Sequence, residues 1–281
     1  MIPLQQAIQE ATARLAAAGV PSPQADAELL AGHVLGLGRG AIQARALSGA
    51  VLDDPDAIAF RDLVVRRSAR EPLQHLTGLA HFRALTLAVG PGVFVPRPET
   101  ELVAQFAIDA LAAVASPEPL AVDLGTGSGA LATEVPHAWV VGVEISPDAF
   151  VWAKLNARAA GATNLTLVLG DLATAVPGLD GTVDVVVSNP PYIPLGAVPR
   201  DPEVRLHDPE LALYGGEDGL DLVRALSTRA LALLRPGGAL VVEHAEVQGD
   251  AMRALLAADG WRAPATHPDL LGRPRATTAV K

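Results

Sequence analysis

The sequence has no cysteine among its 281 residues, which excludes disulfide bonds and thiolate chemistry. It also has no apolar run approaching the roughly 20 residues that a helix needs to cross a bilayer. The opening stretch, MIPLQQAIQEATARL, has neither a basic start nor an apolar core, so no signal peptide is expected. Together these absences predict a cytoplasmic protein without a membrane-spanning segment.

Positive charge is also scarce, since 21 lysines and arginines face 31 aspartates and glutamates for a net charge of −10. Residues 1–90 hold eight acids and eight arginines, so the whole excess lies in residues 91–281. Proteins bind nucleic acid largely by neutralising its phosphates with lysine and arginine, so no direct nucleic-acid binding is expected. Four arginines do lie close together, and their helical spacing favours a solvated face: Arg61, Arg66, Arg67 and Arg70.

The N-terminal part is predicted to form a small helical bundle. Apolar residues recur at helical spacing over residues 4–15 and again over residues 25–35, where Gly36 ends the run. A third run, residues 55–68, begins with a proline after two aspartates, which is typical of a helix start. Three short helices with one apolar face each would pack together.

The pattern changes after this bundle. The stretch HFRALTLAV (residues 81–89) mixes apolar and polar residues and predicts a short strand or hairpin. The proline-rich stretch GPGVFVPRPETE (residues 90–101) is interpreted as a connector. A helix is expected to start after Pro98, because Glu99 and Glu101 suit the positive end of a helix dipole.

From about residue 119 the chain alternates between short apolar runs and helical stretches, among them residues 147–160 and 220–234. This alternation predicts an α/β fold, with a mostly parallel sheet covered by helices on both faces. Ligands of such sheets bind beyond the carboxyl ends of the strands, so the polar strand tips are expected along one edge. The five runs are LAVDLG, WVVGVE, LTLVLGD, VDVVVSN and GALVVEH.

The first of these tips is a glycine-rich turn that suits a nucleotide-like cofactor. In VDLGTGSG (residues 122–129) the glycines let the backbone approach a ligand and adopt positive φ angles. Glu144 closes the second strand, where a carboxylate can take both hydroxyls of a ribose, and Asp171 closes the third, where it could face an adenine amino group. The G-x-G-x-G spacing is tighter than the dinucleotide pattern and fits S-adenosylmethionine, which has no pyrophosphate.

The fourth tip is the stretch VVVSNPPYIP (residues 185–194). Asn-Pro-Pro-Tyr after a fourth strand resembles the signature of S-adenosylmethionine-dependent methyltransferases that act on planar nitrogens. Their substrates include the amino groups of adenine and guanine and the side-chain amide of glutamine. The side-chain carbonyl of Asn189 and the backbone carbonyl of Pro190 can accept both N–H bonds of a planar NH₂ group. The prolines fix the carbonyl directions, and Tyr192 stacks on the flat group or closes the site.

Further stretches narrow the resemblance to the bacterial release-factor glutamine methyltransferases, the HemK/PrmC family. They occur in the family's order and extend the resemblance over about 200 of the 281 residues. The most specific of them is Pro-Arg-Pro-Glu-Thr-Glu, ahead of the glycine-rich turn. The stretches are REPLQHLTG, VFVPRPETELV, VDLGTGSGA, VSNPPYIP, DPELALYGGEDGL, LRPGGALVVEH and DLLGRPR.

This resemblance implies a fold and a reaction. The fold is that of a class I S-adenosylmethionine-dependent methyltransferase, Rossmann-like with a mostly parallel seven-stranded sheet, joined to a small N-terminal helical bundle. The implied domains are the bundle in residues 1–75, which docks the release factor, a hairpin and linker in residues 76–97, and the methyltransferase domain in residues 98–281. The implied reaction moves a methyl group from S-adenosylmethionine to N5 of the glutamine in the Gly-Gly-Gln motif of peptide chain release factors. It leaves S-adenosylhomocysteine and needs no metal.

The resemblance also assigns roles to residues. The catalytic residues it implies are Asn189, Pro190 and Tyr192. The implied substrate-binding residues are Asn189, Pro190, Pro191 and Tyr192. The implied cofactor-binding residues are Gly125, Thr126, Gly127, Ser128, Gly129, Glu144, Asp171, Leu172 and Asn189.

The chain departs from the family pattern at three points. The interval between Asp123 and Glu144 is short, so only a short first helix fits between the first two strands, and cofactor affinity could suffer. Leu172 stands where relatives often have an aromatic residue, and Glu144 stands where many have aspartate. Two further residues are candidates: His244 is interpreted as a structural histidine, and Arg97 as either a ligand contact or a loop anchor.

Two alternatives remain open at this point. A DNA or RNA exocyclic-amine methyltransferase would use the same Asn-Pro-Pro-Tyr turn, although the acidity of the chain argues against it. A non-catalytic S-adenosylmethionine-binding module would bind the cofactor without turnover, and the short first helix gives that hypothesis some weight.

Overall fold

The computed structural model describes residues 1–135 and 137–281. The chain divides into two compact units. The first is Met1–Leu79 together with Arg200–His207, and the second is Ala80–Pro199 together with Asp208–Lys281. Nothing in the sequence suggested that a short segment from the second half of the chain belongs to the first unit.

The first unit is a bundle of helices around one apolar core. The three predicted helices are confirmed. Gly36 follows the second of them in the left-handed conformation. Asp53 caps the start of the third, residues 54–68, by accepting from the Asp56 amide at 2.9 Å. The number three is wrong, because α3 and α5 also form within residues 1–79, and each buries too few apolar residues to give a clear pattern. The helices are α1 (Leu4–Ala17), α2 (Pro23–Leu35), α3 (Arg39–Leu47), α4 (Asp54–Ser68), α5 (Leu73–Thr77) and α9 (Pro202–His207). The strands β1 (Ile2–Pro3) and β2 (Val51–Leu52) pair antiparallel.

The predicted solvated face of arginines is wrong for two of its four members. Arg67 is only 3% exposed and forms ion pairs with Asp26 at 2.7 Å and with Glu203 of α9 at 2.8 Å. Arg70 also pairs with Glu203, at 2.8 Å. These arginines therefore neutralise carboxylates inside the first unit. Their ion pairs with Glu203 hold α9 in that unit.

The second unit begins with a two-stranded sheet, β3 (Leu79–Phe82) and β4 (Leu85–Ala88), as the sequence predicted. The connector leads into α6 (Thr100–Ala112), so the helix predicted after Pro98 is confirmed. The main sheet has the order β10-β11-β9-β8-β5-β6-β7. Its strands are β5 (Leu120–Leu124), β6 (Trp139–Glu144), β7 (Leu165–Leu169), β8 (Val183–Ser188), β9 (Leu234–Glu243), β10 (Arg262–Pro268) and β11 (Pro274–Val280).

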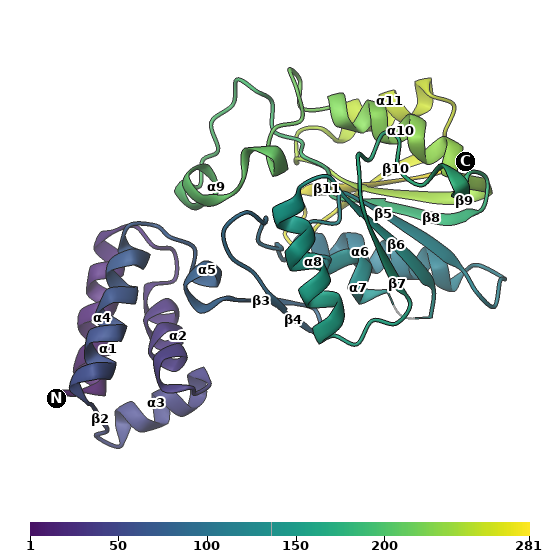
Figure 1. The fold of residues 1–281 in the computed structure, drawn as a ribbon. Helices are drawn as coiled ribbons and strands as arrows, with labels where there is room; N and C mark the ends of the chain where they lie inside the picture. The colour runs from purple at the N-terminus through teal and green to yellow at the C-terminus, as the bar shows by residue number, and fades with distance from the viewer. Residues whose placement is uncertain (136) are drawn as a thin grey trace. The chain divides into compact units, whose positions relative to one another are not determined.

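The five strands read from the sequence are parallel to one another, while β11 and β10 complete the sheet antiparallel at one side (Figure 1). The remaining helices of this unit are α7 (Ala130–Glu134), α8 (Pro147–Ala159), α10 (Asp221–Leu233) and α11 (Gly249–Ala258), with short 3₁₀ turns η1 (Pro177–Leu179) and η2 (Glu210–Ala212). α7 has five residues, as the short interval before Glu144 predicted. No helix in the described residues is long and apolar enough to cross a membrane.

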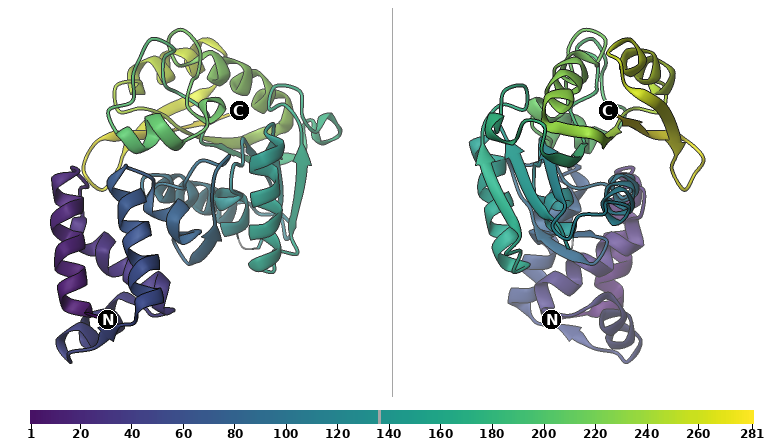
Figure 2. Two further views of the ribbon diagram at one scale, coloured as in Figure 1. Left: turned by 60° about the vertical axis from the view of Figure 1, so that its left-hand side comes forward. Right: turned by 90° about the vertical axis from the view of Figure 1, so that its right-hand side faces the viewer.

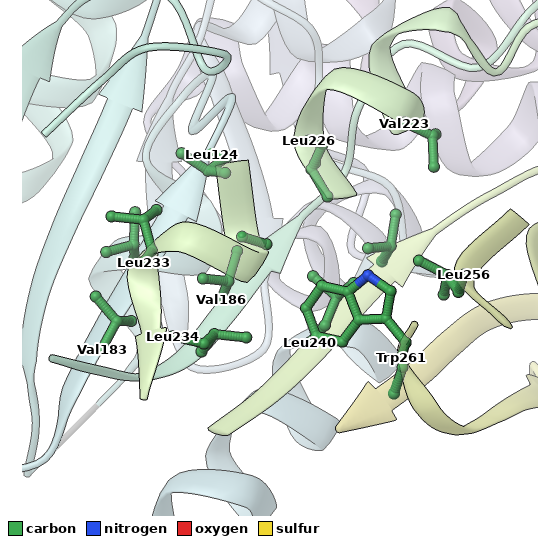
Figure 3. Packing of buried hydrophobic residues seen from close by; sticks show 14 of the residues in the cluster. Leu124, Val183, Val186, Val223, Leu226, Leu233, Leu234, Leu240, Leu256 and Trp261 are labelled. Atoms are coloured by element: carbon green, nitrogen blue, oxygen red, sulfur yellow. The ribbon is translucent and has the colours of Figure 1, made fainter. Parts of the chain in front are cut away.

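Helices cover both faces of this sheet. The ribbon shows helices on both sides of the sheet (Figures 1 and 2). Alternate strand residues pack on one side against α10 and α11 and on the other against α6 and α7. Figure 3 shows the first of these cores, which includes Val186 and Leu240 of the sheet, Leu226 of α10 and Leu256 of α11. Burying apolar side chains stabilises the fold by about 25 cal/mol per Å². The two cores bury both faces of the sheet, so the ends of its strands are the places left for a site.

Candidate active site

The polar strand tips lie along one edge of the sheet, as predicted. The parallel register pairs Asp123 with Val187, and Glu144 with Leu169. Two hydrogen bonds tie neighbouring tips together: Ser188 Oγ donates to the Leu124 carbonyl at 2.5 Å, and the Gly170 amide donates to the Glu144 carbonyl at 2.8 Å. In a parallel sheet this edge is where ligands bind.

The glycine turn, residues 125–129, follows β5 and bends through three residues of positive φ. Gly125, Gly127 and Gly129 have φ angles of 81°, 56° and 80°. A β-carbon added at Gly125 or Gly127 would have no atom within 4 Å, so the outer side of the turn is open to a ligand. A β-carbon at Gly129 would lie 3.3 Å from Cα of Ala153, so this last glycine allows close packing against α8. The turn therefore presents bare backbone to the space beyond the sheet.

Asp123 stabilises this turn through a hydrogen bond with Thr126. Its side chain is fully buried, and Oδ2 accepts a hydrogen bond from Thr126 Oγ1 at 2.6 Å. Burial raises the pKa of Asp123 to about 7, and the nearby Glu144 carboxylate also raises it, while the Thr126 bond acts in the opposite direction. Thr126 and Ser128 are buried too.

Glu144 joins the second strand to the glycine turn. Its Oε2 accepts from the Gly127 amide at 2.8 Å, and its Oε1 accepts from the Ser146 amide at 2.8 Å. Each carboxylate oxygen has a second lone pair that can accept from a ligand. The Glu144 carboxylate thus supports the turn. The contact with the ribose that the sequence predicts stays a prediction.

Asp171 and Leu172 lie just after β7. Asp171 is exposed and its Oδ1 accepts from the Ala173 amide at 2.8 Å, which forms a local turn. Leu172 is half-buried and packs against the core under α10. The predicted contact of this pair with adenine stays a prediction.

The Asn-Pro-Pro-Tyr turn, residues 189–192, follows β8. Asn189 is half-buried, and its Nδ2 donates to Thr100 Oγ1 at 3.1 Å. No described residue donates to Asn189 Oδ1 or to the Pro190 carbonyl. Both oxygens that the sequence assigns to the substrate amide are therefore without a protein donor in the described part of the chain.

A second layer of residues, which sequence reasoning missed, holds this turn in place. Gln248 Nε2 donates to the Tyr192 carbonyl at 3.0 Å. A β-carbon on Gly219 would lie 2.3 Å from that same oxygen, and one on Gly215 would lie 2.4 Å from the Pro191 carbonyl oxygen. These two glycines belong to the stretch YGGEDGLD, so its glycine content is the signal that could have revealed the contact. Only glycine allows the two backbones to approach this closely.

Glu243 is a further residue of the site that sequence reasoning did not assign. It ends β9, is 1% exposed, and its Oε1 accepts from the Tyr192 hydroxyl at 3.3 Å. Burial raises the pKa of Glu243 to about 7, against the lowering effects of the Thr100 hydroxyl and the Arg275 charge. Burial and the Glu243 charge also raise the pKa of Tyr192, so its hydroxyl stays protonated and can donate.

The two remaining candidates, His244 and Arg97, both have protein partners. His244 is fully buried, with Nδ1 at 2.8 Å from the Ala245 carbonyl and Nε2 at 2.9 Å from Thr277 Oγ1. Arg97 Nη2 donates to Asp208 Oδ2 at 2.7 Å and its guanidinium lies over the Phe94 ring, which anchors the connector. In the described residues no three metal-ligating side chains gather at one point.

Comparisons with known proteins identify the family. A family model described as the PrmC N-terminal domain matches residues 6–78, and one described as a methyltransferase domain matches residues 120–262. A release factor glutamine methyltransferase of Streptomyces coelicolor is 53% identical, over 98% of this chain and 96% of its own. The chain belongs to the release factor glutamine methyltransferases. The resemblance read from the sequence motifs is thereby confirmed.

The chain is also similar to one relative with a different printed activity and to one solved structure. A 4-amino-L-phenylalanine/4-methylamino-L-phenylalanine methyltransferase of Streptomyces pristinaespiralis is 42% identical, over 94% of this chain and 91% of its own. The solved structure of a 16S rRNA methyltransferase from T. thermophilus, in complex with AdoMet and guanosine, covers 72% of this chain and 49% of its own. It superposes with a TM-score of 0.55 at 23% identity, which supports the fold alone. The predicted class I methyltransferase fold with a seven-stranded, mostly parallel sheet is confirmed.

Proposed function

We propose that this chain transfers a methyl group from S-adenosylmethionine to N5 of the glutamine in the Gly-Gly-Gln motif of peptide chain release factors. One observation supports this most directly. The open glycine turn and the unengaged oxygens of Asn189 and Pro190 lie at the same edge of one rigid sheet. The family membership supports the choice of glutamine among planar nitrogens.

The Asn-Pro-Pro-Tyr turn would act by positioning the substrate. An amide nitrogen is a poor nucleophile because its lone pair is delocalised into the carbonyl. Asn189 Oδ1 and the Pro190 carbonyl would each accept one N–H of the glutamine amide, which fixes the nitrogen and raises its electron density. Aligning reactants in this way can contribute roughly 7–11 kcal/mol to lowering a barrier. Pro191 would keep the carbonyl directions fixed, and Tyr192 would close the site over the flat group.

The glycine turn fits S-adenosylmethionine, which supplies an electrophilic methyl group on sulfur. Residues 125–129 would contact it through bare backbone, because a β-carbon at Gly125 or Gly127 would fill the open space beside the turn. Glu144 would bind the ribose hydroxyls through its remaining lone pairs, and Asp171 with Leu172 would flank the adenine. S-adenosylhomocysteine would be released, and the chemistry needs no metal, since the reacting groups are fixed by hydrogen bonds alone.

Family membership also suggests the partner and a role for each part of the chain. Residues 1–75 would dock the release factor, residues 76–97 would link, and residues 98–281 would catalyse. Release factors act on cytoplasmic ribosomes, so the enzyme would act in the cytoplasm. The net charge of −10 argues against direct binding of nucleic acid.

A second candidate substrate is a free aryl amine. The Streptomyces pristinaespiralis relative, by its name, methylates 4-amino-L-phenylalanine, and it matches 94% of this chain. An aryl NH₂ is planar and would satisfy the same two carbonyl oxygens. A small substrate would not need a docking surface, so the two candidates differ in what the N-terminal unit does.

One experiment separates the candidates. The protein is incubated with methyl-labelled S-adenosylmethionine and one of three substrates: a release factor, the same factor with its loop glutamine changed to alanine, or 4-amino-L-phenylalanine. We expect label only on the intact release factor, mapped to the glutamine by mass spectrometry. Label on the amino acid alone would transfer the assignment to the aryl amine, and label on neither would overturn methylation of both.

A further inference from the structure

The side chain of Asn156 joins three separate parts of the second unit. It lies on α8 and is only 2% exposed. Its Nδ2 donates to the Ser128 carbonyl of the glycine turn at 2.9 Å and to the Ala88 carbonyl at the end of β4 at 3.0 Å. Its Oδ1 accepts from the Ala88 amide at 2.7 Å. The oxygen and both N–H groups of this carboxamide are therefore bound to backbone atoms.

The bond to Ser128 fixes one peptide group of the glycine turn. No other hydrogen bond to the Ser128 carbonyl forms among the described residues. The amide of the same peptide group belongs to Gly129 and donates to the Thr126 carbonyl at 2.8 Å. Both ends of this peptide group are thus held, directly after the part of the turn that is open to a ligand at Gly127.

The helix that carries Asn156 also approaches the turn closely. A β-carbon added at Gly129 would lie 3.3 Å from Cα of Ala153. Ala153 is fully buried and precedes Asn156 by three residues, so the two share one face of α8. The close packing and the hydrogen bond are therefore two separate contacts between the same helix face and the same turn.

The β3–β4 hairpin sets the orientation of the Asn156 carboxamide. A carboxamide can present either its oxygen or its nitrogen, and the Ala88 amide decides between them because an N–H donor can bond only to Oδ1. Nδ2 is then left for the two carbonyls. If the group turned over, Nδ2 would face the Ala88 N–H and Oδ1 would face the carbonyl oxygens. The hairpin and the residues after it pack on α8 through one apolar cluster, which contains Ala80, Val89, Val93, Val95, Ala149 and Trp152.

We propose that Asn156 is a positioning residue for the cofactor. The hairpin orients its carboxamide, and the carboxamide holds the glycine turn in the shape that binds S-adenosylmethionine. The hairpin thereby contributes to the cofactor site through Asn156 and the backbone of Ser128. This inference rests on the proposed function, because it concerns the turn that is proposed to hold S-adenosylmethionine.

The decisive variant is Asn156→Asp, which keeps the shape of the side chain but has no N–H. One oxygen can still accept from the Ala88 amide, while the other faces the two carbonyls that Nδ2 bound. We expect the Kd for S-adenosylmethionine, measured by calorimetry, to rise roughly 10- to 100-fold, because buried carbonyls lose their donor. The kcat at saturating cofactor should stay within a few-fold of the wild type, because the Asn-Pro-Pro-Tyr turn is unchanged. Asn156→Ala, which loses the same bonds without adding an oxygen, should also raise the Kd and serves if the aspartate variant does not fold.

Asn164→Asp is the matched control. Asn164 Nδ2 also donates to two carbonyls, those of Val135 at 3.1 Å and Ala138 at 2.7 Å, but Asn164 precedes β7, at the amino ends of the strands. The same substitution there should destabilise the protein comparably and leave the Kd near that of the wild type. A Kd raised equally by Asn164→Asp would attribute the effect to general loosening and overturn the proposal. A wild-type Kd in Asn156→Asp or Asn156→Ala would overturn it too.

Amide hydrogen exchange without cofactor gives a readout that a merely structural role would not change selectively. In Asn156→Asp the Gly129 amide and its neighbours in the turn should exchange roughly tenfold faster, while the amides of β5 and β8 keep their wild-type rates. Equal acceleration in the turn and in these strands would contradict the proposal. If the wild type itself binds no S-adenosylmethionine, it is the proposed function that fails, and the exchange rates still decide whether Asn156 fixes the turn.

Discussion

Asn189 is the residue whose removal should separate substrate positioning from cofactor binding. The described structure leaves its Oδ1 without a protein donor while its Nδ2 is held by Thr100. We expect Asn189→Ala to lower kcat by roughly 10²–10³-fold, comparable to the loss of one preorganised polar contact. The Kd for S-adenosylmethionine, measured by calorimetry, should change little. Turnover equal to that of the wild type would contradict the role of the turn.

Glu144 should show the opposite pattern. Replacing it by alanine removes the predicted ribose acceptor and also frees the Gly127 and Ser146 amides that it holds at 2.8 Å. We expect Glu144→Ala to raise the Kd for S-adenosylmethionine at least tenfold, about 1.4 kcal/mol, while kcat at saturating cofactor stays within a few-fold. The exposed Glu118→Ala provides the matched control. An unchanged Kd in Glu144→Ala would remove Glu144 from the cofactor site.

At the scale of elements, the loop before α10 supports the Asn-Pro-Pro-Tyr turn by fitting against its backbone. Gly219 has a φ of 79°, and a β-carbon there would lie 2.3 Å from the Tyr192 carbonyl oxygen. We expect Gly219→Ala to displace the turn and to lower kcat at least tenfold. Gly196→Ala is the control, since a β-carbon there meets no atom within 4 Å and its φ is ordinary. Equal activities of the two variants would show that the close approach is dispensable.

The elements themselves could largely be predicted from the sequence. The five parallel strands have continuous apolar runs because both of their faces are buried, and the helices between them have clear periods. The resemblance implied seven strands, but local patterns did not locate β10 and β11. Residues 262–268 are all exposed or half-buried and include two prolines, so no strand pattern stands out. Likewise α3 buries only Ile42 and Ala46.

The site could be predicted only in part, for a different physical reason. Residues that follow a strand directly, such as Glu144 and Asn189, were found because a parallel sheet brings strand ends to one edge. Thr100 and Gln248 were not found. They reach the Asn-Pro-Pro-Tyr turn from 89 and 56 residues away, and local patterns contain no information about such contacts.

At the scale of the whole molecule, the chain passes between its two units three times. It leaves the first unit after Leu79, returns to it with Arg200 and leaves it again after His207. The segment that returns is anchored by Glu203, which pairs with Arg67 and Arg70 at 2.8 Å each. The Asn-Pro-Pro-Tyr turn therefore continues directly along the chain into an element held by the N-terminal bundle.

Stability of the whole protein should depend on the two buried carboxyls at the sheet edge. The pKa values of Asp123 and Glu243 are raised to about 7 from ordinary values of 3.8 and 4.5, because burial disfavours their charged forms. The folded state thus holds protons that the unfolded state releases. The stabilisation from these groups is complete below about pH 4 and is lost as the pH rises through about 7.

Replacing Glu243 tests this pH dependence of stability. Glu243→Gln removes the ionisation, so it should stabilise the protein relative to the wild type more at pH 8 than at pH 5. The difference should be about 2–3 kcal/mol, from roughly two pKa units at about 1.4 kcal/mol each. Urea unfolding at the two pH values measures it. Glu246→Gln, which replaces an exposed carboxylate, is the control and should show no such difference. An equal effect of Glu243→Gln at both pH values would disprove the raised pKa.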